Sequence, residues 1–357
     1  MSDLLEESLE RLFAERCGPE VRRRAEEEGF AAELFVLLEE SGFTQLSVDE
    51  RAGGAGGGIA EAATLCRLAG RHAVPLPLAE CTLLGGSLVA TAGMTLPPGP
   101  LGVALPHRGD GLVLSGGAGS WRLSGRVGRV PFGGRASHLA AVVEGAGDEH
   151  VLLVPVALAA VEAGRNLAGE ARDALRFDDV SLGDAHVAEA PPGTAADLEL
   201  RGALSRSLLI AGAAEAVSAM TLDYAGERRQ FGRPIAGFQA VANRLVLLAA
   251  EAELAGMAAR VAAERFAALG SAAAFEVAAA KASASRAATA VAAHAHQVHA
   301  AIGMTRDYPL HHFTRRLWVW RQEWGGEGHW ARRLGTLAAD CGAEGLWPRL
   351  TAEPSAS

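Results

Sequence analysis

The chain has 357 residues, 49% of them hydrophobic, and a formal net charge of −9. This length provides for two or three domains with sizeable cores, and this composition is typical of a folded protein rather than a disordered one. The acidic balance argues against nucleic acid as a main partner, because neutralising a phosphate backbone requires a basic face. The four cysteines lack the C-x-x-C spacing of metal or redox sites, so we expect reduced thiols in a cytoplasmic protein.

No segment predicts contact with a membrane. The first seven residues are acidic and amphipathic, unlike a secretory signal peptide. The most apolar run, residues 204–220, contains Arg206 and Glu215 and is too short and too charged to cross a bilayer. We therefore expect this run to be a buried helix of the core.

Residues 1–100 are predicted to form a helical domain. Apolar side chains recur at helical spacing in two stripes, one around Leu9 and the other around Leu34. A glycine-rich loop at residues 53–58 then precedes another helix. Prolines between residues 75 and 100 mark the exit from the region.

Residues 101–190 predict a β domain. The sequence changes there to short, valine-rich apolar runs separated by Gly-Gly or Gly-Asp turns. Strands are expected at residues 101–105, 112–114, 138–143, 151–154 and 175–180. Their spacing predicts an antiparallel barrel or sandwich.

Residues 191–345 predict a bundle of four long helices, followed by a tail at residues 346–357. The helices are expected at residues 197–227, 238–268, 272–300 and 310–340, the last with a break. Short loops between long helices are typical of an antiparallel bundle. The predicted fold class is therefore α+β, with an N-terminal helical domain, a central antiparallel β-barrel or sandwich, and a C-terminal four-helix bundle.

Two connections between these helices carry more polar chemistry than a turn requires. The first, residues 224–239, places arginine and phenylalanine side chains around a turn broken by glycine and proline: Arg228, Arg229, Phe231, Arg233 and Phe238. Guanidinium groups bind phosphate oxygens in pairs, and an aromatic ring beside them can lie against a planar base. The second, residues 297–309, is another polar insertion at a helix end and closes with a Tyr-Pro pair.

These two segments resemble the R-x-x-F-G and Q-x-x-G-G-x-G motifs of the acyl-CoA dehydrogenase family. The resemblance extends along nearly the whole chain and includes the G-G-x-G loop that begins at Gly53. In that family the same order of domains occurs, and the two motifs hold the pyrophosphate and adenine ends of FAD, usually from two subunits. The resemblance thus implies an FAD oxidoreductase acting on acyl-CoA, with cofactor contacts from Arg228, Phe231, Gln239, Gln297 and Gly303.

The family's reaction needs a carboxylate base, which removes the α-proton of the acyl-CoA while the β-hydride passes to the flavin. The resemblance implies two places for this base. Counting from the Tyr-Pro pair gives Trp324, and counting back from the Phe-Gly pair gives Gly202; neither can take a proton. Glu323 and Glu327 are the fallback candidates for a displaced base, and ordinary solvated helix-end glutamates are the alternative.

Other segments also depart from the family pattern. Residues 103–110 and 125–134 stand where the family binds the flavin ring, but match its T-E-P-x-x-G-S-D and W-x-T-N segments poorly. Ala300 and Ala301 replace the paired glycines of the second motif. The added methyl groups could crowd the backbone where it approaches the dinucleotide.

Each cofactor assignment has a structural alternative. Arg228 and Arg229 could cap the C-terminus of a helix, where cations are favoured. Gln297 could be a satisfied buried amide. Three histidines nearby do not share one helical face and have no interleaved carboxylate, so we expect no metal site there: His294, His296 and His299.

Three functions stay open. The chain can be a base-free subunit of a heterotetrameric acyl-CoA dehydrogenase, lending its motifs to FAD on a catalytic homologue. It can instead be a homo-oligomeric dehydrogenase with a displaced glutamate base, or a flavin-dependent oxygenase on the same fold. We favour the first, with sterol side chains or other bulky acyl-CoAs as substrates and an electron-transferring flavoprotein or oxygen as the acceptor.

Overall fold

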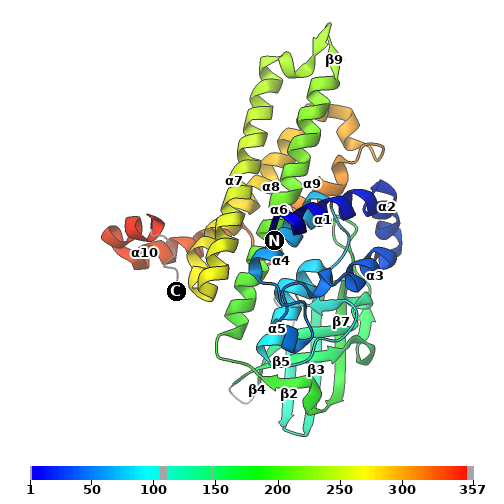
Figure 1. Ribbon diagram of the computed structural model, residues 1–357, viewed down its shortest axis with the longest axis vertical. Helices are drawn as coiled ribbons and strands as arrows, with labels where there is room; N and C mark the ends of the chain where they lie inside the picture. Colours follow the sequence, from blue (N-terminus) through cyan, green and yellow to red (C-terminus); the bar gives the residue numbers. More distant parts are fainter. Residues whose placement is uncertain (1, 105–110, 146–147, 352–357) are drawn as a thin grey trace. The chain divides into compact units, whose positions relative to one another are not determined.

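The structure, a computed structural model, describes residues 2–104, 111–145 and 148–351. Along the chain, helices are followed by strands and then by longer helices, so the predicted α+β fold class is confirmed (Figure 1). Most of the first poorly matching flavin-side segment, residues 105–110, lies outside the described residues, as does the tail beyond residue 351.

Two compact units divide the chain. The first comprises the residues up to Cys66 together with Val74–Gly202, and the second comprises Arg67–Ala73 together with the residues from Ala203 onwards. Two of the three boundaries fall inside helices, whose residues are therefore shared between the units, and the third follows Ala73.

The first unit begins with short helices. They are α1 (Ser2–Arg16), α2 (Pro19–Glu28), α3 (Ala32–Glu40), the N-terminal part of α4 (Ile59–Arg71) and α5 (Gly85–Thr91), with a π-helical turn at Glu80–Leu84 and single 3₁₀ turns at Phe43–Gln45 and Glu50–Ala52. The bounds of α2 follow from its sequence. Pro19 occupies the first turn, where its missing N–H is not needed, and Gly29 ends the helix with φ 83°.

The glycine-rich loop at residues 53–58 needs glycine where its backbone packs directly against another stretch of backbone in this unit. A Cβ on Gly54 would lie 2.0 Å from the carbonyl oxygen of Val48, and one on Gly57 would lie 2.4 Å from that of Leu46. The backbone N–H of Gly57 donates to the same Leu46 oxygen at 2.9 Å. No larger residue fits at either position.

Eight strands of the first unit form two four-stranded sheets. One has the order β1-β4-β5-β8, with β1 (Leu101–Val103), β4 (His138–Gly145), β5 (Asp148–Pro155) and β8 (Val187–Glu189). The other has the order β2-β3-β7-β6, with β2 (Gly111–Gly117), β3 (Ser120–Pro131), β7 (Arg172–Leu182) and β6 (Ala160–Glu162). The pairings are antiparallel except for β1 with β4, which a long connection allows to run parallel. Side chains of both sheets share one core, including Leu123 and Leu152, as in a sandwich.

Long helices make up the second unit. They are α6 (Thr194–Glu227), α7 (Gln239–Leu269), α8 (Ala274–His299), α9 (Leu310–Trp320) and α10 (Glu327–Thr351). Figure 1 shows α6 and α7 running antiparallel, joined by a hairpin of β9 (Arg229–Gln230) and β10 (Arg233–Pro234). The fourth predicted helix is therefore two, α9 and α10, separated by a turn, and α10 itself changes direction at Gly342.

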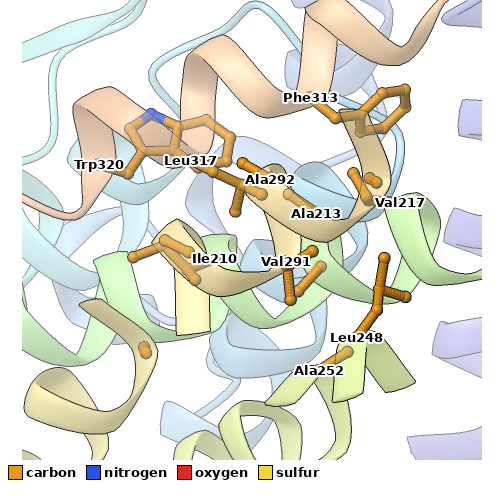
Figure 2. Packing of buried hydrophobic residues seen from close by; sticks show 14 of the residues in the cluster. Ile210, Ala213, Val217, Leu248, Ala252, Val291, Ala292, Phe313, Leu317 and Trp320 are labelled. Atoms are coloured by element: carbon orange, nitrogen blue, oxygen red, sulfur yellow. The ribbon is translucent and has the colours of Figure 1, made fainter. Parts of the chain in front are cut away.

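The bundle core lies where α6, α7, α8 and α9 meet (Figure 2). Ile210 and Val217 of α6 pack with Leu248 of α7, Val291 of α8 and Leu317 of α9. Burying one such side chain contributes about 1.5–3 kcal/mol. Among the described residues α6 alone has the length and hydropathy of a membrane span, but more than half of its most apolar stretch is buried, as expected of a core helix.

Candidate functional site

The connection between α6 and α7 is a tight hairpin. The Arg228 N–H donates to the Tyr224 carbonyl in the last turn of α6 at 2.9 Å, and the Ile235 N–H donates to the Arg228 carbonyl at 2.8 Å. At the tip, Phe231 and Gly232 have φ of 50° and 80°. This pair of left-handed conformations is what a type I′ turn requires. The Phe-Gly pair of the motif therefore shapes the turn.

The side chains of this hairpin have few partners. Phe231 is 92% exposed. The guanidinium of Arg233 lies 4.1 Å from the ring centroid of Phe238, and that of Arg229 donates to the hairpin's own backbone. Within the described residues, no hydrogen bond or ion pair engages the exposed side chain of Arg228. Among the described residues, neither guanidinium is seen to bond a carbonyl of α6, and that of Arg228 remains available to an anionic ligand.

The second segment is shaped by the end of α8. Ala300 adopts φ 54° and ψ −135°, which stops the helix and costs a residue other than glycine about 1–3 kcal/mol. Gly303 in the following 3₁₀ turn is buried, and a Cβ there would lie 2.8 Å from the Cβ of His299. Gln297 is exposed, so the buried-amide alternative does not apply.

The two segments meet at one end of the bundle. Val298 of α8 shares a small apolar cluster with Ala225 of α6 and Leu245 of α7, and Ile235 of the hairpin packs against it. The five predicted cofactor contacts therefore gather here: Arg228, Phe231, Gln239, Gln297 and Gly303. A free guanidinium, two exposed amides and an exposed aromatic ring fit the phosphates and the planar base of a dinucleotide.

The position predicted for the base lies in the turn between α9 and α10. Trp324 there is 4% exposed and has φ 56°. Its carbonyl accepts from the indole N–H of Trp330 at 2.7 Å. The indole of Trp324 itself has a donor but no basic atom. Gly202, the other position that the resemblance implies, lies in α6 and has no side chain.

Glu323 is held by an ion pair inside the second unit. Its Oε2 lies 2.7 Å from Nε of Arg206, and the two side chains are 7% and 2% exposed. The ion pair with buried Arg206 of α6 turns this carboxylate toward the bundle interior. Glu327 is exposed in the first turn of α10, where the helix dipole favours a negative charge.

Lys281 holds the same turn from α8. Its buried ammonium group donates to Ser285 Oγ at 3.0 Å, to the Arg321 carbonyl at 3.1 Å and to the Gly325 carbonyl at 2.7 Å. Burial lowers the pKa of Lys281 to about 7, and the neighbouring Arg206 acts in the same direction. The sequence alone did not predict this role, although the one signal for it was there: Lys281 is the only lysine of the chain.

The three histidines of α8 have separate partners. His294 lies beside an arginine of α7. His296 Nε2 is 2.9 Å from Thr314 Oγ1, and His299 Nδ1 is 2.9 Å from the Ala295 carbonyl of its own helix. Burial lowers the pKa of all three, which favours neutral rings. Their arrangement is that of packing residues.

The second poorly matching flavin-side segment lies in the first unit. Residues 125–134 form the end of β3 and the turn after it, where Phe132 is buried with φ 51°. Asp173 of β7 accepts from the backbone N–H of Gly134 at 2.7 Å and of Gly164 at 3.1 Å. Asp173 thus ties this turn to a second loop of the same unit.

Comparison with known proteins places these features in one family. The model of the acyl-CoA dehydrogenase N-terminal domain matches residues 2–94, and that of the acyl-CoA dehydrogenase C-terminal domain matches residues 201–333. The acyl-CoA dehydrogenase IpdE2 of Mycobacterium tuberculosis is 30% identical over 248 residues, which are 68% of this chain and 69% of that protein.

Two solved structures share the fold along nearly the whole chain. One is the ChsE4–ChsE5 complex from Mycobacterium tuberculosis, with TM-score 0.87 and 25% identity over 95% of this chain and 97% of the matched chain. The other is a variant of the Tcur3481–Tcur3483 steroid ACAD, with TM-score 0.85 and 25% identity over 96% and 98%. The chain therefore belongs to the acyl-CoA dehydrogenase family of FAD-dependent oxidoreductases.

Proposed function

We propose that the chain is a base-free subunit of a heteromeric acyl-CoA dehydrogenase and supplies half of an FAD site to a homologous catalytic subunit. One observation carries the proposal: a buried indole, Trp324, stands at the position that the resemblance implies for the base, while the guanidinium of Arg228 has no partner among the described residues. The partner then supplies the carboxylate that removes the α-proton.

The exposure of the hairpin supports sharing of the cofactor between subunits. Phe231 lies at the tip of the hairpin with a left-handed backbone and is 92% exposed. Its ring therefore buries little apolar surface in the isolated chain. Burying that ring and Arg228 against a second subunit and a bound dinucleotide removes apolar surface from water and neutralises the guanidinium.

A face of α7 offers an interface for that subunit. Large apolar side chains are exposed along it at Val246, Leu247, Leu254, Met257 and Val261. The last three recur at spacings of three and four, so they form one stripe. Exposed apolar stripes of this kind mark protein contacts. Similarity to a chain of the ChsE4–ChsE5 complex supports a heteromeric assembly.

The substrates that we propose are acyl-CoAs with bulky, sterol-like acyl groups, in line with the similarity to a steroid ACAD. FAD, when bound, accepts the hydride from the β-carbon. The contribution of this chain is to bind and orient the dinucleotide end through Arg228, Phe231, Gln239, Gln297 and Gly303. An electron-transferring flavoprotein as the acceptor and a reducing cytoplasmic compartment complete the proposal; the free thiols agree with the latter.

Co-purification with a homologue that carries the family's base tests this proposal. We expect the chain alone to hold little flavin and to show no bleaching with an acyl-CoA. The co-expressed pair should carry FAD at less than one per chain and bleach when the substrate is added. If the chain alone is yellow, with one flavin per chain that an acyl-CoA bleaches, the proposal is wrong.

That outcome would favour the homo-oligomeric alternative, for which Glu327 is the better placed base because it is exposed whereas Glu323 is ion-paired. Glu327→Gln then decides the matter. Loss of turnover, with flavin content and thermal stability unchanged, would identify Glu327 as the displaced base. Unchanged turnover would exclude it.

A further inference from the structure

Three aromatic rings, of which one pair is stacked and the other two pairs meet edge-on or tilted, join the two cofactor-binding segments. Tyr224 comes from the last turn of α6, His299 from the end of α8 and Tyr308 from the chain just before α9. The ring centroids of Tyr224 and His299 are 4.5 Å apart with the planes 20° from parallel. Tyr308 lies 4.8 Å from His299 and 5.9 Å from Tyr224, so each ring touches the other two.

Each side of this stack is fixed to a cofactor-binding element by its backbone. The Tyr224 carbonyl accepts the N–H of Arg228, so the last turn of α6 presents that arginine. On the other side, His299 directly precedes Ala300, and Gly303 packs so closely on His299 that a Cβ would lie 2.8 Å from its Cβ. Displacing either ring therefore displaces the segment attached to it.

The hydrogen bonding of His299 indicates that its ring acts by packing rather than as a polar ligand. His299 Nδ1 is engaged by the Ala295 carbonyl of its own helix. His299 Nε2 is buried and has no hydrogen-bond partner among the described residues. Burial lowers the pKa of His299, which favours the neutral ring. An uncharged ring whose remaining nitrogen is unpartnered contributes through its faces, which contact the two tyrosines.

The third ring closes the stack on α6. The hydroxyl of Tyr308 lies 3.5 Å from the Met220 carbonyl, one helical turn before Tyr224. The strained backbone of Ala300 directly follows the stacked His299, and Gly303 packs tightly against that same histidine. Strained residues persist when their surroundings determine them in this way.

We infer that the Tyr224–His299–Tyr308 stack is a positioning element that couples the Arg228 hairpin to the Gln297–Gly303 segment. Each of these two segments depends on the ring contacts with the other to keep its position. The consequence for FAD rests on the proposed function, whereas the coupling itself is a property of this chain alone.

Hydrogen–deuterium exchange of the full chain tests the coupling without cofactor. Tyr224→Leu removes the ring on α6, and we expect the amides of residues 297–304 to exchange about tenfold faster. His299→Leu is the reverse experiment and should accelerate exchange in residues 228–239. Tyr224→Phe keeps the ring and is the matched control, with both segments at wild-type rates.

Two results would overturn the inference. In one, each leucine variant changes exchange only in the segment that contains it. In the other, exchange rises equally everywhere, including residues 279–285 near the other end of α8, which reports general destabilisation instead of coupling.

Affinity for FAD in the co-purified assembly separates this inference from the proposed function. Tyr224→Leu should raise the Kd for FAD about tenfold, and by less than that on an Arg228→Ala background, because the contribution that the ring makes through Arg228 is then already lost. If Arg228→Ala weakens binding and Tyr224→Leu does not, the positioning role fails and the proposed function stands. If Arg228→Ala has no effect, the proposed function fails, and the exchange experiment still decides the coupling.

Discussion

Two regions of the bundle differ in whether their polar side chains are exposed or buried. At the hairpin end, Arg228, Gln239 and Gln297 are exposed, and Arg228 has no partner among the described residues. At the turn between α9 and α10, Glu323 is buried in an ion pair, and the buried Lys281 of α8 donates to two carbonyls of the turn. Free groups can bind a ligand, whereas engaged groups hold the fold. A polar residue near a family motif is therefore informative only when its partners are known.

The largest effect that this contrast predicts is on stability, at Glu323. Glu323→Ala leaves the buried Arg206 guanidinium without its carboxylate, and we expect a loss of about 3–5 kcal/mol in the free energy of unfolding. Glu327→Ala, an exposed neighbour, is the control and should change it by less than about 0.5 kcal/mol. Urea denaturation measures both. Similar values for the two variants would show that the ion pair does not hold the turn.

The next effect is on cofactor affinity, at Arg228. Arg228→Ala should weaken FAD binding by the co-purified assembly about 10- to 100-fold, because a hydrogen bond to a charged group contributes about 1.5–3 kcal/mol. The melting temperature of the Arg228→Ala variant should equal that of the wild type, since the Arg228 side chain has no partner within the described residues. Arg11→Ala, an exposed arginine of α1, is the control. A fall in melting temperature without loss of FAD would reverse the assignment.

A pH dependence is expected from Lys281, whose pKa is lowered from 10.5 to about 7 by burial. Between these values the unfolded chain keeps the proton and the folded chain loses it. The free energy of unfolding therefore rises with pH over this window, by up to about 1.4 kcal/mol per pH unit from this group. Lys281→Met removes that slope. Urea titrations at pH 7 and pH 9 compare the two proteins. An identical slope in both would show that Lys281 stays charged on its three acceptors.

The smallest effect concerns the strained end of α8. Ala300→Gly relieves a backbone with φ 54° and should raise the free energy of unfolding by about 1 kcal/mol. Ala301→Gly is the matched control, because Ala301 does not have positive φ, and it should be neutral or slightly destabilising. Calorimetry resolves a difference of this size. Equal shifts in the two variants would mean that the Ala300 conformation carries no strain.

Local sequence predicted the long helices well. Periodicity placed a helix at residues 238–268, and α7 spans Gln239–Leu269. It missed β3, since Ser120–Pro131 contains glycines and three arginines that hide the alternation of a strand. The second sheet depends on this strand, which pairs with both β2 and β7.

In the candidate site, too, some residues could be predicted from the sequence and others could not. The cofactor motifs are contiguous in sequence, so their residues could be named before the structure was known. The ion pair of Arg206 and Glu323 joins residues 117 positions apart. Two of the three acceptors of Lys281 are backbone carbonyls, which no pattern of side chains encodes. Tertiary packing alone determines these contacts.

The solitary lysine gives the folded chain an unusual chemical property. Because Lys281 is fully buried, an amine-reactive reagent finds no accessible side-chain amine on the native bundle. Acylation at this position can proceed only when α8 and the neighbouring turn separate. Mass spectrometry of a single labelled peptide would thus report the opening rate of the bundle, with no engineered probe.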